Sequence, residues 1–389
     1  MDFEETEEQK MIADTSREIA GEFGPDYWLE KEEEGEFGQE CWDTLVKNNF
    51  TGILVPEDYE GEGMGMLEFS IAVDELASMG CAAGWYLGIN AIFGVTPVKK
   101  FGTEEQKEKY LPKLAKGMEA CMALTEPDSG SNTLNTKTLA VKEGDEYVIN
   151  GQKMFTTHAD RANLMLLITR TTPREKAERK TSGITLFLVD LPDKSVTCES
   201  IPKHAMNYSH TCSVFIDDLR VPEDAVVGEV DEGWWAATEV LNPERMWGAS
   251  LGCGLGTCAL NYAIDYAKKR NVFGDPIGSY QGIQLPIANA WTKIQAARLL
   301  TRKGAYLHDK GEFYLDVANA AKHVATDAAT DACWTAVQTF GGYGFAKEQH
   351  VERWWREVQL MRLAPITGQL ELALIGQHIL GLPKSFRTV

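Results

Sequence analysis

The stretch Leu124-Thr-Glu-Pro-Asp-Ser-Gly-Ser-Asn132 marks the point where the pattern of the chain changes. Before it, from Glu5 to about Lys116, apolar residues recur at intervals of three and four, which is typical of amphipathic helices. After it come short runs of β-branched and apolar residues bounded by Gly, Asp and Asn, which predict strands. From Asp231 onward the helical period returns in long segments. The quoted stretch therefore joins a helical part to a β part.

These patterns predict an α+β chain of three domains. Residues 1–118 form a helical domain, residues 119–229 a β domain, and residues 230–389 a second helical domain. A capping box, Thr103-Glu-Glu-Gln106, opens one helix of the first domain. The predicted strands of the second are Thr138-Leu-Ala-Val-Lys142, Glu146-Tyr-Val-Ile-Asn150, Leu164-Met-Leu-Leu-Ile-Thr-Arg170 and Gly183-Ile-Thr-Leu-Phe-Leu-Val189, and strand character continues from Asp193 to about Val227.

Composition excludes several classes of protein. The chain has 389 residues, and its 58 acidic against 38 basic side chains give a formal net charge of -20. Nucleic acid is excluded as a general partner because phosphate binding needs clustered Lys and Arg. An anionic membrane surface would repel the chain as well.

Location and redox state follow from further sequence features. The start Met1-Asp-Phe-Glu-Glu5 has no basic and no apolar region, so we expect no secretory signal and a cytoplasmic protein. Two uncharged stretches, Cys81 to Val98 and Met246 to Ile264, contain Asn, Thr or Ser and are expected to be buried helices rather than membrane spans. The eight cysteines show no metal-ligand spacing, so we expect buried thiols and no metal site; they are Cys41, Cys81, Cys121, Cys198, Cys212, Cys253, Cys258 and Cys333.

Three later segments share the features of the opening stretch, with turn residues next to hydroxyl, amide or aromatic side chains. They are Asn150-Gly-Gln-Lys-Met-Phe-Thr-Thr157, interpreted as a hairpin followed by an aromatic ring and two hydroxyls, Arg270-Asn-Val-Phe-Gly-Asp-Pro-Ile277, and Gln338-Thr-Phe-Gly-Gly-Tyr-Gly-Phe345. Such segments can hold a polar ligand through side chains and backbone N–H groups. The run Gly252-Cys-Gly-Leu-Gly256 is similar to a dinucleotide loop, but no strand precedes it, so a Rossmann site is not expected.

Taken in order, these segments resemble the acyl-CoA dehydrogenase family over essentially the whole chain. The motifs that carry the resemblance are Pro56-Glu-Asp-Tyr-Glu-Gly61, Phe101-Gly-Thr-Glu-Glu-Gln-Lys107, Tyr110-Leu-Pro112, Leu124-Thr-Glu-Pro127, Gly151-Gln-Lys153, Arg270 with Phe273-Gly274 and Pro276-Ile277, Gln281, and Gln338-x-Phe-Gly-Gly342. The resemblance implies a helical N-terminal domain, a middle β-barrel and a C-terminal four-helix bundle. It also implies FAD, an acyl-CoA substrate in fatty acid β-oxidation, electron-transfer flavoprotein as the acceptor, and a homotetramer.

The resemblance assigns cofactor and substrate residues by position. Residues expected against the isoalloxazine are Met122, Leu124, Thr125, Ser131, Phe155 and Thr157. Those expected to hold the pyrophosphate and adenosine of FAD across the subunit contact are Arg270, Phe273, Gln281, Gln338, Gly341 and Gly342, and Thr367 and Gln369 are also expected at the cofactor. Substrate contacts are expected from Ser131, Asn242 and Arg245.

The catalytic base is where the sequence departs from many members of the family. Those members carry a Tyr-Glu-Gly-Thr stretch near the C-terminus, and Pro365 occupies the position of its carboxylate here. Some relatives, such as isovaleryl-CoA dehydrogenase, carry the base earlier, just before an Arg. That position is Glu244, followed by Arg245, so the resemblance implies Glu244 as the base that removes the α-proton while the β-hydrogen leaves as hydride to flavin N5.

Physical chemistry alone leaves two interpretations of Glu244. A carboxylate at the start of a long apolar helix and sealed from water should have a raised pKa, which suits a general base. Alternatively, Glu244 only complements a helix N-terminus, with Asn242 as N-cap and Pro243 as the first helical residue.

Pro365 also removes a backbone N–H. In the family that N–H helps to polarise the thioester carbonyl, and we expect Ile366 to supply the donor instead.

Three functions remain open at this point. They are an acyl-CoA dehydrogenase using Glu244, a flavin oxidase on the same fold that passes electrons to oxygen, and a catalytically silent flavoprotein subunit.

Overall fold

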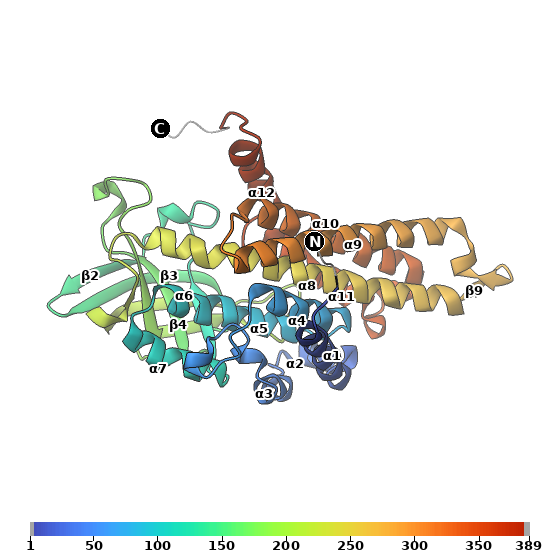
Figure 1. Ribbon diagram of the computed structural model, residues 1–389, viewed down its shortest axis with the longest axis horizontal. Coiled ribbons are helices and arrows are strands. Elements are labelled where there is room, and N and C mark those ends of the chain that lie inside the picture. Colours follow the sequence, from blue (N-terminus) through green and yellow to red (C-terminus); the bar gives the residue numbers. More distant parts are fainter. Residues whose placement is uncertain (1–3, 385–389) are drawn as a thin grey trace. The chain divides into compact units, whose positions relative to one another are not determined.

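The structure, a computed structural model, describes residues 4–384 and divides into two compact units. The helical unit comprises the described residues of 1–30, 65–85 and 242–389; the sheet unit comprises residues 31–64 and 86–241. The predicted order of helical, β and helical segments is confirmed (Figure 1). Of the N-terminal residues Met1 to Glu5, on which the expectation of no secretory signal rests, the first three lie outside the described residues.

Helices lie on both sides of the sheet in the sequence, and the three long helices α8, α9 and α10 all follow it. The first group is α1 (Glu7–Glu22), α2 (Pro25–Glu34), α3 (Gln39–Lys47), α4 (Met66–Ser78), α5 (Ala83–Gly88), α6 (Thr96–Phe101) and α7 (Glu104–Ala115). The second group is α8 (Gly233–Lys269), α9 (Gln281–Asp309), α10 (Leu315–Phe340), α11 (Val351–Leu363) and α12 (Gly368–Leu374). The predicted capping box is confirmed, because the Thr103 hydroxyl accepts from the N–H of Gln106 and the Gln106 side chain accepts from the N–H of Thr103.

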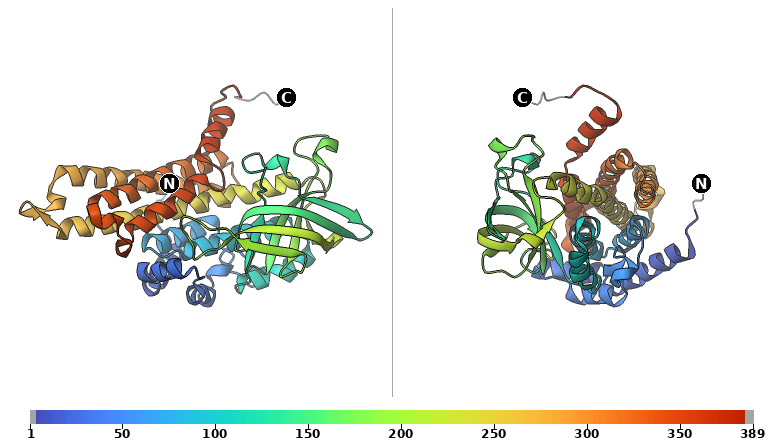
Figure 2. Two further views of the ribbon diagram at one scale, coloured as in Figure 1. Left: turned by 180° about the vertical axis from the view of Figure 1, so that it is seen from behind. Right: turned by 60° about the vertical axis from the view of Figure 1, so that its left-hand side comes forward.

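The sheet unit is built on an eight-stranded sheet (Figure 2). Its strands are β1 (Ala120–Ala123), β2 (Leu139–Glu143), β3 (Glu146–Thr157), β4 (Leu164–Arg170), β5 (Ile184–Asp190), β6 (Val196–Ser200), β7 (Thr211–Pro222) and β8 (Val226–Val227). The strand order is β6-β7-β3-β2-β4-β5-β8, and β1 pairs in parallel with β4. The four predicted strands correspond to β2, the first part of β3, β4 and β5. The sequence analysis missed β1, which has only four residues.

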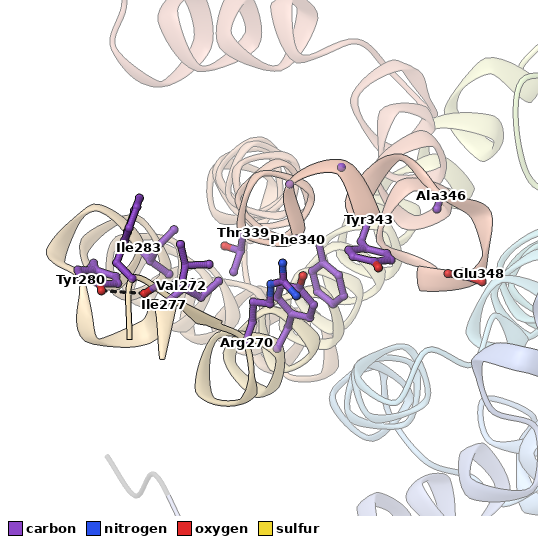
Figure 3. Close-up of a pocket in the computed structure, with 14 residues that line it drawn as sticks. Arg270, Val272, Ile277, Tyr280, Ile283, Thr339, Phe340, Tyr343, Ala346 and Glu348 are labelled. Atoms are coloured by element: carbon purple, nitrogen blue, oxygen red, sulfur yellow. Dashed lines mark hydrogen bonds between the residues drawn. The ribbon is translucent and has the colours of Figure 1, made fainter. Parts of the chain in front are cut away.

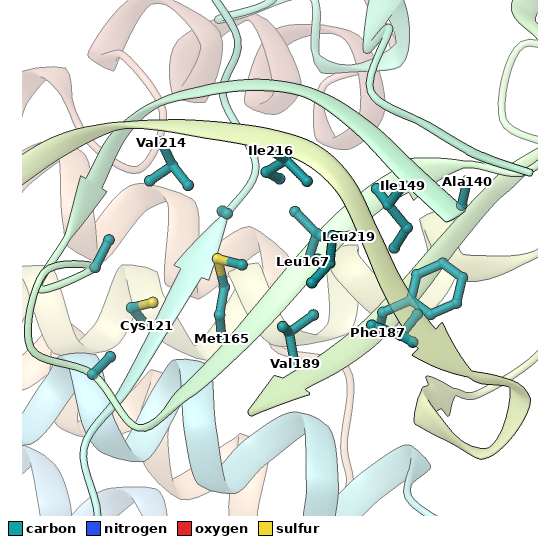
Figure 4. Close-up of a cluster of buried hydrophobic side chains, with 14 of the residues drawn as sticks. Cys121, Ala140, Ile149, Met165, Leu167, Phe187, Val189, Val214, Ile216 and Leu219 are labelled. Carbon is teal, nitrogen blue, oxygen red and sulfur yellow. The ribbon is translucent and has the colours of Figure 1, made fainter. Parts of the chain in front are cut away.

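Apolar side chains from these strands form the core of the sheet unit. Cys121, Met165 and Leu167 come from the parallel strands β1 and β4, and Phe187 and Val189 from the neighbouring β5 (Figure 4). All five are buried. β4 is buried along its whole length, so its continuous apolar run fits a strand covered on both faces.

The hairpin predicted at Asn150-Gly151 is wrong. β3 runs straight through this point, and its pairing with β7 shifts register between Ile149 and Gly151, as in a β-bulge. A Cβ on Gly151 would lie 2.4 Å from the Thr138 hydroxyl oxygen. The glycine therefore permits the close approach of a neighbouring segment and does not form a turn.

Four long helices of the helical unit share one core. Cys258 and Ala263 of α8, Ile294 of α9, Ala329 of α10 and Trp354 of α11 are all buried within it. The stretch Met246 to Ile264 lies inside α8, where small residues allow close helix contact. Across residues 4–384, none of the helices combines the length and apolar character required to cross a lipid bilayer.

The expected helix start at Asn242 is wrong, because α8 begins at Gly233 and Pro243 lies inside it. Glu244 is therefore an interior residue of a long helix and does not complement a helix N-terminus. Ala237 and Val240, before the proline, are already buried. Tertiary packing of this apolar face outweighs the backbone hydrogen bond that Pro243 cannot donate.

A buried ion pair fixes the loop that follows β1. Lys153 Nζ lies 2.8 Å from Glu126 Oε1 and donates to the carbonyl oxygen of Leu124 at 3.1 Å. The Glu126 carboxylate also accepts from the backbone N–H groups of Lys137 and Thr138. Burial alone would raise the pKa of Glu126, but Lys153 and these donors lower it to about 2. Burial lowers the pKa of Lys153 to about 8.

We expect Lys153→Met to destabilise the protein strongly, because it leaves the Glu126 carboxylate buried without its cation. The free energy of unfolding should fall by about 3 to 5 kcal/mol, measured by urea unfolding. The control is Lys137→Met, which removes an exposed ion pair of 3.0 Å with Asp128 and should cost no more than about 1 kcal/mol. Equal losses in the two variants would contradict a structural role for the buried pair.

The contact of α8 with α4 gives a second prediction about stability. A Cβ on Gly254 would lie 2.4 Å from the carbonyl oxygen of Asp74 and 2.6 Å from Ala77 Cβ. We expect Gly254→Ala to lower the free energy of unfolding by about 1 to 3 kcal/mol through overpacking. On the same helix, a Cβ on Gly248 would have its nearest neighbour, Lys322 Cγ, at 4.0 Å.

Gly248→Ala is therefore the matched control and should be neutral or stabilising by up to about 1 kcal/mol, since Ala favours helix more than Gly. Thermal unfolding followed by circular dichroism compares the two. If the Gly254→Ala protein were as stable as the Gly248→Ala protein, the prediction would be wrong, because α8 and α4 could then make room for the methyl group without loss of stability.

Candidate active site

The residues expected against the flavin ring lie in the sheet unit, around the end of β1 and the second half of β3. Met122 lies on β1, and Leu124 and Thr125 follow it directly. The carbonyl oxygen of Thr125 accepts from the N–H of Met154 at 2.8 Å, which joins this loop to β3 beside Phe155. The structure therefore brings these predicted residues together within one unit. Thr157 ends β3, and Ser131 lies in the exposed part of the loop.

Phe155 has two properties that mark it as a contact residue. Its side chain is 61% exposed, and its backbone has a φ of 56°. A left-handed backbone is uncommon for a bulky residue and costs free energy, and such residues concentrate at functional sites. The exposed ring and the strained backbone both support a ligand at this edge of β3.

A second group of predicted cofactor residues lines a pocket of about 790 Å³ in the helical unit. Arg270 and Phe273 reach it from the segment after α8, and Gly341 and Gly342 from the segment after α10. Figure 3 shows Arg270 beside Phe340. The remaining lining residues are Tyr266, Val272, Ile277, Tyr280, Ile283, Thr339, Phe340, Tyr343, Ala346 and Glu348.

The chemistry of this pocket fits a dinucleotide carrying a pyrophosphate. Arg270 offers an exposed guanidinium, whose planar donors suit phosphate oxygens. Phe273 is 95% exposed and has a φ of 56°, the same combination as Phe155. A Cβ on Gly341 or Gly342 would meet no atom within 4 Å, so a ligand can approach the backbone there. These residues could hold the non-flavin part of FAD.

Four predicted cofactor residues lie outside this pocket lining. Gln281 is the first residue of α9, and Gln338 lies near the end of α10. Thr367 is the N-cap of α12, where its hydroxyl accepts from the N–H of Leu370, and Gln369 lies in the first turn of that helix. The roles of these four residues stay predictions.

Glu244 lies in a buried group of charges within the helical unit. Its side chain is 6% exposed, and among the described residues no donor lies within hydrogen-bond distance of its Oε2. Burial raises the pKa of Glu244 to about 8, although Arg245 and Lys322 act in the opposite direction. The neighbouring Arg245 is also buried, and its Nη1 donates to Asn242 Oδ1. The three residues predicted on this helix are therefore in one place.

The sequence analysis missed Lys322 and Glu371, which complete the charged group. Lys322 Nζ lies 2.7 Å from Glu371 Oε1, and both side chains are 0% exposed. Burial lowers the pKa of Lys322 and raises that of Glu371. One signal was available, since Lys322 is the only Lys or Arg between Lys310 and Lys347, and it lies on the alanine-rich face of α10 with Ala318, Ala325 and Ala329.

The segment at Pro365 stands against this group of charges. Lys322 Nζ donates to the carbonyl oxygen of Ile366 at 2.9 Å. This bond fixes the carbonyl of Ile366, and the role of its N–H toward the substrate stays a prediction.

Comparisons with known proteins show which family the chain resembles. Three family models match the chain: acyl-CoA dehydrogenase, N-terminal domain, over residues 6–118, middle domain over 121–219, and C-terminal domain over 231–380. Acyl-CoA dehydrogenase FadE12 of Mycobacterium tuberculosis is 36% identical over 387 residues, which is 99% of each chain. The caffeyl-CoA reductase-Etf complex subunit CarC of Acetobacterium woodii is 34% identical over 96% of this chain and 99% of its own.

A solved structure leads to the same family. Butyryl-CoA dehydrogenase from Megasphaera elsdenii matches with a TM-score of 0.93 and 30% identity, over 98% of this chain and 100% of that chain. The predicted fold, the enzyme class and the FAD cofactor are thereby confirmed at the level of the family. The chain belongs to the acyl-CoA dehydrogenase family of FAD-dependent oxidoreductases.

Proposed function

We propose that the protein catalyses the α,β-dehydrogenation of an acyl-CoA thioester with Glu244 as the base, as in the subgroup typified by isovaleryl-CoA dehydrogenase. The observation that carries this proposal is a buried carboxylate with a free oxygen and a pKa of about 8. Pro365 supports it, since proline offers neither a carboxylate nor a backbone N–H at the alternative position.

The roles of the side chains follow from their surroundings. Glu244 accepts the α-proton at Oε2, the oxygen that has no donor among the described residues. Arg245 donates to Asn242 and places a positive charge next to Glu244. Glu244 must be ionised before it can accept the proton, and this charge favours its ionised form. FAD bound at this site would supply the acceptor for the β-hydrogen, taken as hydride. Phe155 with Leu124 and Thr125 would hold its ring, and Arg270 with Phe273 would hold pyrophosphate and adenosine parts across the subunit contact.

Electron transfer and assembly belong to the same proposal. We infer that electrons pass to an electron-transfer flavoprotein, which fits a relative that is itself a subunit of an Etf complex. We also infer a homotetramer acting in β-oxidation. Large apolar side chains exposed along α9 support burial against a second copy; they are Leu285, Trp291, Leu299 and Tyr306.

We expect Glu244→Gln to abolish substrate-dependent bleaching of the flavin. The amide cannot take a proton, so the rate of flavin reduction should fall at least about a hundredfold while FAD stays bound. Purified protein is titrated anaerobically with acyl-CoAs of graded length, and air is then admitted to test for peroxide. Glu239→Gln is the matched control, since Glu239 lies on the same helix but pairs with Lys100 at the surface.

The outcomes of this titration separate the three functions. Bleaching by wild type and not by Glu244→Gln supports the base, and a slow response to air favours the dehydrogenase. Rapid peroxide formation would indicate an oxidase. A yellow protein that no acyl-CoA bleaches would indicate a silent subunit, and undiminished bleaching by Glu244→Gln would place the base elsewhere.

The pKa of Glu244 predicts the pH dependence of the reaction. Because the base must be unprotonated in the free enzyme, kcat/KM should rise with pH and level off above about pH 8. The rate of flavin reduction at low substrate concentration, measured over a range of pH, tests this. A profile that levels off near the ordinary glutamate value of 4.5 would contradict a buried base.

Protein stability gives an independent check of the same pKa. The folded state holds the Glu244 proton more tightly than the unfolded chain, so its contribution to stability is complete below pH 4.5 and is lost as pH rises to about 8. Glu244→Gln cannot ionise and should lose less stability across this interval than wild type. Parallel stability curves would contradict the raised pKa.

A further inference from the structure

The buried ion pair of Lys322 and Glu371 joins three parts of the helical unit. Lys322 lies on α10, Glu371 lies on α12, and Lys322 also donates to the carbonyl oxygen of Ile366, just before α12. One ammonium group thus contacts both the segment that contains Pro365 and the helix that follows it. Replacing Lys322 by an apolar residue would remove the bond to the Ile366 carbonyl and would also leave the Glu371 carboxylate buried without its cation.

The same ammonium faces the proposed base. Gly248 follows Glu244 by one helical turn, so both lie on one face of α8. The nearest atom to a Cβ built on Gly248 is Lys322 Cγ, at 4.0 Å. The Lys322 stem therefore lies beside the face of α8 that carries Glu244.

The charged neighbours of this group come from three helices and one connecting segment. Glu244 faces Arg245 on its own helix and Lys322 on α10. Arg245 faces Glu244, Glu371 and Tyr314. Glu371 faces Lys322, Arg245 and His323, whose Nδ1 lies 3.7 Å from Glu371 Oε2.

The balance of charges has a consequence for Glu244. Glu371 lies in direct contact with Lys322 and holds it in place, whereas the negative charge formed on Glu244 has Arg245 and Lys322 as its cationic neighbours. In a buried site a positive charge at short range stabilises an anion much more than it does in water. Lys322 therefore acts on Glu244 through charge, without a hydrogen bond to it.

We propose that Lys322 is a positioning residue for the reaction: it fixes the segment at Pro365 and Ile366, and it promotes ionisation of Glu244. This inference rests on the proposed function, because it takes Glu244 as the base. It goes beyond that function because it assigns to Lys322, which forms no hydrogen bond with Glu244, an effect on the pH at which the base ionises.

Flavin reduction tests the proposal in the holoenzyme. The probe is the acyl-CoA that bleaches wild type fastest in a panel from butyryl-CoA to palmitoyl-CoA with isovaleryl-CoA. We expect Lys322→Met to move the acid limb of the rate profile about one unit to higher pH, with a rate about tenfold lower at neutral pH. At high pH, where Glu244 ionises in both proteins, the rates should converge.

Two further variants keep the test open if Lys322→Met folds poorly. Lys322→Arg retains the positive charge, so the acid limb of its rate profile should lie at the same pH as in wild type. The double variant Lys322→Met/Glu371→Gln leaves no orphaned carboxylate and should still show the shift. The control is Lys293→Met, which removes one positive charge in an exposed pair with Asp331 and should leave the profile unchanged.

A substrate-free measurement separates this inference from the proposed function. Unfolding free energies of wild type, Lys322→Met, Glu244→Gln and the double variant Lys322→Met/Glu244→Gln form a cycle that gives the coupling between the two residues. We expect coupling above about pH 8, where Glu244 is ionised, and near additivity at low pH. Coupling would hold even if another residue were the base.

Two results would overturn the proposal. One is an additive cycle at high pH. The other is a Lys322→Met enzyme whose rate falls equally at every pH, which would make Lys322 a purely structural residue. Bleaching that survives Glu244→Gln would instead reject the base and leave the coupling to be judged by the cycle alone.

Discussion

The burial of two carboxylates and two cations among α8, α10 and α12 is the constraint on which the site depends. Each of these charges would be costly alone in such surroundings, and each is tolerated because the others stand beside it. The pairing is unequal. Lys322 and Glu371 lie 2.7 Å apart, whereas Glu244 retains an oxygen without a donor among the described residues. Within this group Lys322 and Glu371 form the close ion pair, whereas Glu244 faces Arg245 and Lys322 through charge.

The sheet unit uses the same kind of interaction for the opposite purpose. Around Glu126 every donor points at the carboxylate, and its pKa falls to about 2. Such a carboxylate keeps its charge at any ordinary pH, so it can anchor a loop but cannot act as a base. Glu244 and Glu126 are both buried beside a lysine. The difference between them is the number of hydrogen bonds, which separates the carboxylate that anchors a loop from the one proposed as the base.

Sequence periodicity predicted the order of segments and four strands, because these depend on local patterns of apolar residues. It failed where tertiary contacts decide. Asn150-Gly151 has the composition of a turn, yet the glycine serves a close approach to Thr138 within a continuous strand. Asn242-Pro243 has the composition of a helix start, yet packing carries α8 through it. Family motifs pointed to Arg270 and Glu244, but Glu371 lies far along the chain from its partner Lys322, and no local pattern could have paired them.

The proline at position 365 links these observations. In the proposed function the base lies on α8 and not near Pro365, so Glu244 needs an electrostatic environment that allows it to ionise, and the segment at Pro365 needs contacts that fix its shape. Lys322 meets both needs, since it bonds to the Ile366 carbonyl on one side and faces Glu244 on the other. In the proposed function the segment around Pro365 supplies no reacting group, and its tie to Lys322 is its link to the charged group. The pKa of Glu244 is high because the carboxylate is buried, and any change that admits water to it would lower that pKa.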